Sequence, residues 1–116
     1  MRILFVENHD QFASVVIRAF LNKHEVTVVK NIASALDHFI NNEYDVLLVD
    51  YDLDDGKGDR LVQSIRKDNL RVKIVAVSSH ERGNEALLES GADAVCSKIE
   101  FSKIGDILES LTFPRS

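Results

Sequence analysis

The stretch Val46-Leu47-Leu48-Val49-Asp50 is a run of four apolar residues that ends in a carboxylate, and residues 51–58 after it have the composition of a loop. Four apolar residues without polar alternation predict a strand that is buried on both faces. In doubly wound α/β folds, ligands bind outside the carboxyl ends of such strands. Asp50 is therefore a candidate functional residue.

Strand-like and helix-like segments alternate along the rest of the chain. The helix-like segments carry apolar side chains three and four residues apart, which is the pattern of one buried helix face. This alternation predicts an α/β fold, in which crossover helices pack on both sides of a parallel sheet. The fourth helix, which ends at Gly91, is expected to be the shortest. The expected strands are 3–6, 26–29, 46–49, 74–77 and 94–96, and the expected helices contain the apolar positions of 12–20, 32–40, 61–65, 86–88 and 104–111.

Length and composition predict one globular domain over residues 1–116, with 112–116 as a short C-terminal tail. The chain is 45% hydrophobic and long enough to bury a core without disulfides or metals. Its single cysteine, Cys96, lies in an apolar run, which indicates a buried, unreactive thiol and favours a reducing cytoplasm. No run approaches the roughly 18 apolar residues that span a membrane. A net charge of −5 disfavours direct binding to nucleic acid.

Polar side chains follow four of the predicted strands. Glu7 and Asn8 follow the first strand, Asp50 the third, Ser78 the fourth and Lys98 the fifth. Because the carboxyl ends of parallel strands share one edge of the sheet, we expect these side chains to meet in one crevice. Acids and serines after strands also cap helices, but four such positions together favour a functional site.

The chemistry of this set indicates phosphoryl transfer. Glu7 and Asp50 at about 4 Å would repel by about 4 kcal/mol at an effective dielectric of 20, so a bound cation or the Lys98 ammonium must lie near them. Carboxylate, amide and carbonyl oxygens are the ligands that Mg²⁺ prefers. With a metal ion, a hydroxyl and a lysine to stabilise the phosphoryl oxygens, an aspartate can attack as the nucleophile.

In the order and spacing of these motifs, the chain resembles the receiver domain of two-component response regulators over essentially its whole length. The resemblance implies a flavodoxin-like (βα)5 three-layer sandwich, with a five-stranded parallel sheet of order 2-1-3-4-5. The motifs are Val6-Glu7-Asn8, Val49-Asp50 with Asp55-Gly56-Lys57-Gly58, Val77-Ser78-Ser79, and Gly91-Ala92-Asp93-Ala94 leading to Ser97-Lys98.

The resemblance also implies a role for each site residue. Asp50 would accept a phosphoryl group from a histidine kinase or a phosphotransfer protein, and Ser78 and Lys98 would contact the phosphoryl oxygens. The protein would be a signalling phosphoacceptor that catalyses only its own phosphorylation and dephosphorylation. Phosphorylation would draw Ser78 toward the new anion and switch the surface of residues 84–111 toward a downstream protein or output domain. The implied Mg²⁺ ligands are Glu7, Asn8, Asp50 and the backbone carbonyl of Asp52.

Several positions depart from the family pattern. Asn8 stands where the family has a second acid, so metal affinity should be weaker. Lys98 precedes Ile99 and not proline, and since a non-proline cis bond costs about 2.5 to 4 kcal/mol, a trans bond is expected. Val95 replaces an aromatic that changes rotamer on activation, and the segment 78–98 is about two residues short. Asn8, Val95 and Ile99 favour the alternative of a pseudo-receiver, a protein-interaction module that phosphorylation does not control.

Three further interpretations concern the same loops. Asp52 and His80 occupy positions that tune the access of water in the family, so we hypothesise that they set the phosphoryl lifetime, which protonation of His80 would change. A calcium loop is disfavoured because it needs a glycine before Gly56 and a glutamate where Leu61 stands. A haloacid-dehalogenase-type phosphatase is disfavoured because the chain lacks a cap and further catalytic length. A weak homodimer is left open.

Overall fold

The computed structural model describes residues 1–111, so the predicted tail at 112–116 lies outside the described residues. Five parallel strands form one sheet in the order β2-β1-β3-β6-β7. Because β4 (Asp52–Leu53) and β5 (Gly56–Lys57) form a separate small sheet, β6 and β7 are the fourth and fifth strands of the main sheet, and the predicted order 2-1-3-4-5 is confirmed. The strands are β1 (Arg2–Val6), β2 (Glu25–Val29), β3 (Val46–Val49), β6 (Lys73–Ala76) and β7 (Ala94–Val95). The α-helices are α1 (Asp10–Phe20), α2 (Ile32–Asn41), α3 (Gly58–Asp68), α4 (Glu81–Ser90) and α5 (Ile104–Leu111).

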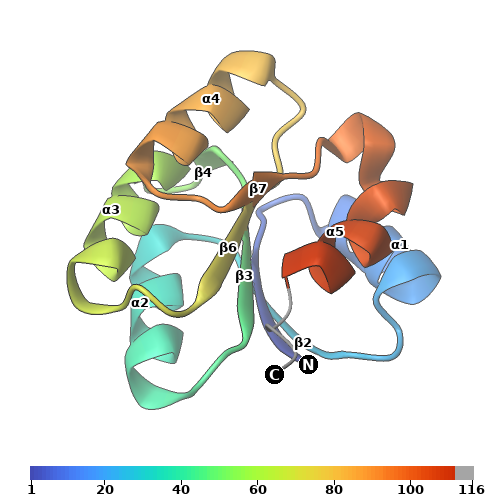
Figure 1. Cartoon of the computed structure of the whole chain (residues 1–116), viewed down its shortest axis with the longest axis horizontal. Helices are drawn as coiled ribbons and strands as arrows, with labels where there is room; N and C mark the ends of the chain where they lie inside the picture. Colours follow the sequence, from blue (N-terminus) through green and yellow to red (C-terminus); the bar gives the residue numbers. More distant parts are fainter. Residues whose placement is uncertain (112–116) are drawn as a thin grey trace.

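Helices cover both faces of this sheet, as Figure 1 shows: α1 and α5 lie on one side and α2, α3 and α4 on the other. Successive side chains of a strand point to opposite faces. In β1, Leu4 therefore packs toward α2 and α3, whereas Phe5 packs toward α1 and α5. All four residues of β3 are buried, as the apolar run before Asp50 predicts. The α/β sandwich expected from the sequence is confirmed.

The two helix-covered faces have different cores. The α2, α3 and α4 side is mainly aliphatic, with Leu61, Val62 and Ile65 of α3 completely or almost completely buried. The α1 and α5 side contains an aromatic cluster in which Phe101 stacks on Phe5, with their ring centroids 6.0 Å apart. Both cores lie beneath the loops at the carboxyl ends of the strands, which therefore rest on a closely packed base.

The structure differs from the sequence-based expectation in three segments. The loop after Asp50 contains two short antiparallel strands, β4 (Asp52–Leu53) and β5 (Gly56–Lys57). A 3-10 helix, η1 (Lys98–Lys103), precedes α5. The prediction that the fourth helix is the shortest was wrong, because α4 has ten residues and α5 has eight. The first turn of α4 is polar, so a search for apolar periodicity does not detect it.

Other local expectations are confirmed. Gly91 caps α4 with a positive φ of 123°, and its N–H donates to the carbonyl oxygen of Leu88 at 3.0 Å. Cys96 is buried and free. No cis peptide bond occurs among the described residues, so the bond between Lys98 and Ile99 is trans. Within residues 1–111, none of the helices has the length and apolar character needed to cross a membrane.

Candidate functional site

Backbone hydrogen bonds extend the sheet beyond its strands and position the site residues. Glu7 N–H donates to the carbonyl oxygen of Val29 at 2.9 Å, and Asp50 N–H donates to that of Val6 at 3.0 Å. The N–H of Val77, next to Ser78, donates to the carbonyl oxygen of Val49 at 2.8 Å. The first loop residues are therefore held in register with the strands, and Glu7, Asp50 and Ser78 lie at one edge of the sheet.

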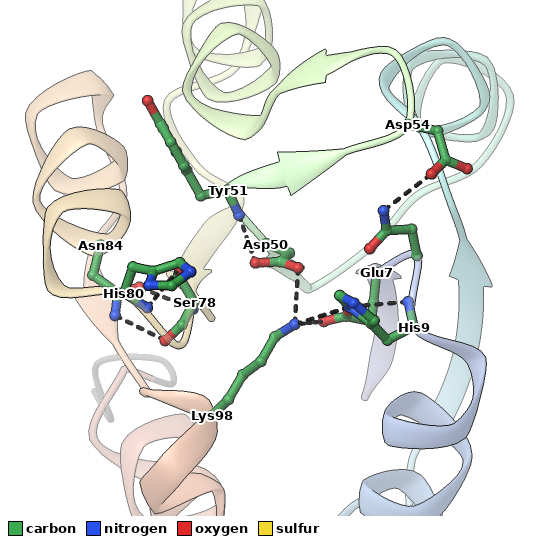
Figure 2. A network of polar contacts seen from close by, with 10 residues as sticks. Glu7, His9, Asp50, Tyr51, Asp54, Ser78, His80, Asn84 and Lys98 are labelled. Carbon is green, nitrogen blue, oxygen red and sulfur yellow. Dashed lines mark hydrogen bonds and ion pairs between the residues drawn. The ribbon is translucent and has the colours of Figure 1, made fainter.

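The ammonium group of Lys98 lies between the two predicted carboxylates (Figure 2). Its Nζ atom is 2.9 Å from Asp50 Oδ2 and 2.9 Å from Glu7 Oε1. The side chains of Glu7, Asp50 and Lys98 are 0%, 5% and 13% exposed, respectively. Lys98 thus supplies the cation that two neighbouring carboxylates require. One ammonium between two carboxylates leaves one negative charge uncompensated inside the site.

This environment shifts the pKa values of Asp50 and Lys98. Burial raises the pKa of Asp50, the hydrogen bond from Lys98 opposes this, and the Glu7 charge adds to it. Burial by itself would lower the pKa of Lys98, but hydrogen bonds to Asp50 and Glu7 outweigh it and raise that pKa. Lys98 therefore remains charged, and Asp50 is a poorly solvated carboxylate of raised basicity. Such a group is a better nucleophile than a carboxylate in water.

Two buried oxygens of the site, Glu7 Oε1 and Asn8 Oδ1, make no hydrogen bond among the described residues, although Glu7 Oε1 lies 2.9 Å from the Lys98 ammonium. Asn8 Nδ2 donates to Asp54 Oδ1 at 3.0 Å, whereas the Oδ1 atom of Asn8 is buried and unpartnered. A buried acceptor without a donor is costly unless a cation satisfies it. Together with the carboxylates of Glu7 and Asp50, this oxygen fits a hard divalent cation such as Mg²⁺.

His9 is close to this site, although the sequence reasoning did not include it. Its N–H donates to Glu7 Oε2 at 3.1 Å, and its Nδ1 lies 3.0 Å from the same oxygen. Potential ligand atoms of Glu7, His9 and Asp50 all lie within 4.8 Å of one another. In the sequence, the signal for His9 was its position two residues after Glu7, the acid at the end of β1. His9 orients the Glu7 carboxylate, whose hydrogen bonds within residues 1–111 are those to His9 and Lys98.

Asp52, the predicted source of a carbonyl ligand, opens β4 two residues after Asp50. Its carboxylate forms an ion pair with Lys57, which lowers the pKa of Asp52. Asp52, Lys57 and His80 line an open groove of about 520 Å³ beside Tyr51. Asp52 and His80 thus lie along one groove, which Tyr51, the residue after Asp50, also lines.

Gly58 brings the start of α3 against the backbone of Asp50. Its N–H donates to the carbonyl oxygen of Tyr51 at 2.6 Å. A Cβ atom at position 58 would lie only 2.0 Å from the carbonyl oxygen of Asp50. Only glycine permits this approach. The Asp50 carboxylate is oriented on the same segment, where its Oδ1 accepts a hydrogen bond from Tyr51 N–H at 2.7 Å.

Ser78 lies on the α4 side of the site, as Figure 2 shows. Its hydroxyl oxygen accepts a hydrogen bond from His80 N–H at 3.1 Å, and its backbone is held by the side chain of Asn84. Sequence reasoning missed Asn84, since one asparagine in a polar segment gives no periodic signal. Its place in the first turn of a helix was the only clue.

Comparisons with known proteins agree with this geometry. A family model described as the response regulator receiver domain matches residues 3–109. The curated proteins include no match to the chain.

Several solved structures are similar in fold. The response regulator TrrA of Thermotoga maritima, in complex with Mg²⁺ and BeF, has a TM-score of 0.86 and 21% identity over 96% of this chain and 98% of that one. A CheY-like receiver domain protein of Methanospirillum hungatei has a TM-score of 0.83 and 20% identity, covering 94% and 90%. The receiver domain of the Francisella response regulator 1452 has a TM-score of 0.77 and 22% identity, covering 94% and 96%.

At such identities the solved structures show a shared fold, and the family model adds a match along nearly the whole chain. The matched residues 3–109 include Glu7, Asp50, Ser78 and Lys98, which the folded chain brings to one edge of the sheet. The chain therefore belongs to the response regulator receiver domain family.

Proposed function

We propose that Asp50 accepts a phosphoryl group in a two-component signalling pathway. The observation that carries this proposal is the buried Asp50 carboxylate, which Lys98 holds at the carboxyl edge of the sheet. A histidine kinase or a phosphotransfer protein would supply the group as a phosphohistidine. An oxygen of Asp50 attacks the phosphorus, the P–N bond breaks, and its electron pair returns to the imidazole of the donor.

The other site residues stabilise the transferred group. Lys98 is already charged beside Asp50, so its ammonium can contact a phosphoryl oxygen without a change in protonation. The Ser78 hydroxyl, whose oxygen accepts from His80 N–H, can donate its hydrogen to a second phosphoryl oxygen. Mg²⁺ held by Glu7, Asn8, Asp50 and the backbone carbonyl of Asp52 would neutralise charge on the phosphoryl oxygens when bound. The Mg²⁺ and BeF complex of the Thermotoga maritima protein supports this assignment.

The phosphorylated domain would act on a downstream protein or output domain through the surface of residues 84–111. A groove of about 520 Å³ on this surface supports the proposal, because Leu88 and Ile99, which are 43% and 81% exposed, line it together with Val95. Exposed apolar side chains beside polar ones are typical of protein interaction sites.

Phosphorylation is tested by incubating the full chain with acetyl phosphate and Mg²⁺ and measuring its intact mass. We expect a gain of about 80 Da, the mass of one phosphoryl group, which chelation of the metal abolishes. Asp50→Asn is the control and should gain nothing. If the wild-type mass does not change and beryllofluoride causes no spectral change, the pseudo-receiver alternative, which Asn8, Val95 and Ile99 favour, replaces this function.

We further propose that Asp52 and His80 set the lifetime of the phosphoryl group, since both line the groove beside Tyr51. Side chains along this groove control how water reaches the phosphoryl group. The phosphorylated protein should therefore hydrolyse at a different rate in His80→Ala than in the wild type at the same pH. Identical hydrolysis rates for the two proteins would contradict this role.

A further inference from the structure

The side chain of Asn84, in the first turn of α4, forms two hydrogen bonds to the backbone of the loop that carries Ser78. Ser78 N–H donates to Asn84 Oδ1 at 3.0 Å, and Asn84 Nδ2 donates to the carbonyl oxygen of Ser78 at 3.1 Å. Asn84 is 7% exposed and Ser78 is 1% exposed. Because water cannot replace these bonds, a shift of Ser78 away from Asn84 would leave two buried polar groups unsatisfied.

The residue before Asn84 brings the same helix still closer to the site. A Cβ atom at Gly83 would lie 2.8 Å from Ser78 Oγ and 2.9 Å from Tyr51 Cβ. The backbone of α4 thus touches the residue that follows Asp50 as well as Ser78. There is no free space in which Ser78 or Tyr51 could move toward α4 independently of the helix.

The carbonyl oxygen of Ser78 has a second partner on the other side. Lys98 N–H donates to it at 3.3 Å, while the ammonium of the same lysine bonds to Asp50 Oδ2 at 2.9 Å. Ser78 therefore connects the lysine of the site to the first turn of α4. Figure 2 shows the two ends of this connection, the bond between Lys98 and Asp50 and the contacts of Ser78 with His80 and Asn84, and the backbone bond from Lys98 N–H joins them.

A phosphoryl group on Asp50 would act on this connection through the Ser78 hydroxyl. In the present structure that oxygen accepts from His80 N–H at 3.1 Å. A phosphoryl group offers strong acceptor oxygens, so the hydroxyl gains by turning its hydrogen toward them. Val95, which lines the groove beside Asn84, has no ring or polar group that could follow this movement.

We propose that Asn84 couples the phosphorylation of Asp50 to helix α4. When Ser78 moves toward the phosphoryl group, its two hydrogen bonds to Asn84 carry the displacement into the first turn of α4, and Gly83 keeps that turn in contact with the loop. This inference rests on the proposed phosphoacceptor function. Asn84 is a positioning residue, because its contacts to the site go through the backbone of Ser78.

Amide NMR of the full chain, with Mg²⁺ and beryllofluoride as the phosphoryl mimic, tests the coupling. In the wild type we expect the amides of Tyr51 and of residues 85–90 to shift. In Asn84→Ala the Tyr51 amide should still shift, because Asp50 and Lys98 are unchanged. The shifts of residues 85–90 should fall to less than about half of the wild-type values.

Two further variants separate coupling from general loosening of the fold. Asn69→Ala is the matched control, because Asn69 Oδ1 likewise accepts from backbone N–H groups, those of Arg71 and Val72 at 2.8 and 3.0 Å, but in the turn between α3 and β6. This variant should keep the full response of residues 85–90. Asn84→Asp retains the acceptor for Ser78 N–H and loses the donor, so its response should be intermediate, and it serves if Asn84→Ala does not fold.

The outcomes distinguish the coupling from the function on which it rests. If residues 85–90 respond equally in Asn84→Ala and the wild type, the coupling is wrong while Asp50 remains the phosphoacceptor. An equal loss in Asn69→Ala and Asn84→Ala would also overturn it, since the effect would be one of general stability. If beryllofluoride shifts no amide in the wild type, the proposed function fails first and the coupling fails with it.

Discussion

The two ends of the sheet carry the same kinds of charged residue in opposite environments. At the amino end, Arg2 and Glu25 form a cross-strand ion pair at 3.3 Å, with side chains that are 44% and 73% exposed. At the carboxyl end, Lys98 contacts Glu7 at 2.9 Å, with side chains that are 13% and 0% exposed. An exposed pair contributes little to stability, whereas loss of one partner of a buried pair is costly.

The difference in burial marks the carboxyl end as the candidate functional site. Two carboxylates and one ammonium are buried there, although apolar residues of similar volume would stabilise the fold at least as well. Burial strengthens the electrostatic interaction between neighbouring groups at this end. A new anion on Asp50 would therefore interact strongly with Ser78 and Lys98. The amino end, surrounded by water, has no such sensitivity.

The largest expected effect is that of Lys98→Met. This substitution leaves Glu7 and Asp50 buried together without a cation, so the free energy of unfolding at neutral pH should fall by about 3 kcal/mol. Urea titrations at constant pH measure the loss. Arg2→Met is the matched control at the amino end and should cost about 0.5 kcal/mol or less. Similar losses in the two variants would remove the contrast between the ends.

Gly58→Ala should have the next largest effect. The new Cβ would lie 2.0 Å from the carbonyl oxygen of Asp50, so α3 or the Asp50 segment must shift, at a cost of about 2 kcal/mol. In Gly105→Ala a Cβ atom meets nothing within 4 Å. Since Gly105 lies in α5, alanine there should stabilise the protein by about 0.5 to 1 kcal/mol. Thermal unfolding of both variants tests the pair, and a neutral Gly58→Ala would argue against a closely packed site.

Asp50→Asn should stabilise the metal-free protein. The pKa of Asp50 is raised in the folded state from its ordinary value of 3.8, mainly by burial. Its favourable contribution to folding is therefore complete below the unfolded pKa and is lost as the pH rises through the folded one. Asparagine removes this loss and leaves Lys98 paired with Glu7, so we expect a gain on the order of 1 kcal/mol at pH 7 and none at low pH. A destabilised variant at pH 7 would contradict the buried excess of negative charge.

The smallest effect concerns Cys96, which lies at the carboxyl end but belongs to the core. Burial, with a smaller contribution from Glu100, raises the pKa of its thiol to about 11. Its contribution to stability is therefore intact below the unfolded thiol pKa of 9.0 and is lost only as the pH rises toward the folded value. At neutral pH a thiol reagent should react with Cys96 only after unfolding. Fast reaction of the native protein would place Cys96 outside the core.

Individual residues show how far the sequence could be read. The apolar run before Asp50 predicted β3 correctly, because a parallel strand that is buried on both faces is a continuous run of apolar residues in the sequence. The regular apolar spacing of Phe12 and Val16 likewise predicted α1. Strands β4 and β5 and helix η1 were missed. Each is short, and its backbone is held by particular hydrogen bonds that leave no periodic pattern in the sequence.

The sequence by itself determined the alternation of strands and helices and the presence of polar residues at the strand ends, since both are encoded by residues close together in the chain. Only the tertiary structure decided which of those residues meet. Lys98 contacts Glu7 and Asp50 across 91 and 48 positions of sequence. Asn84 reaches Ser78 only because α4 begins where it does. Such contacts depend on how the helices pack against the sheet, and that packing is settled by the whole core and not by local spacing.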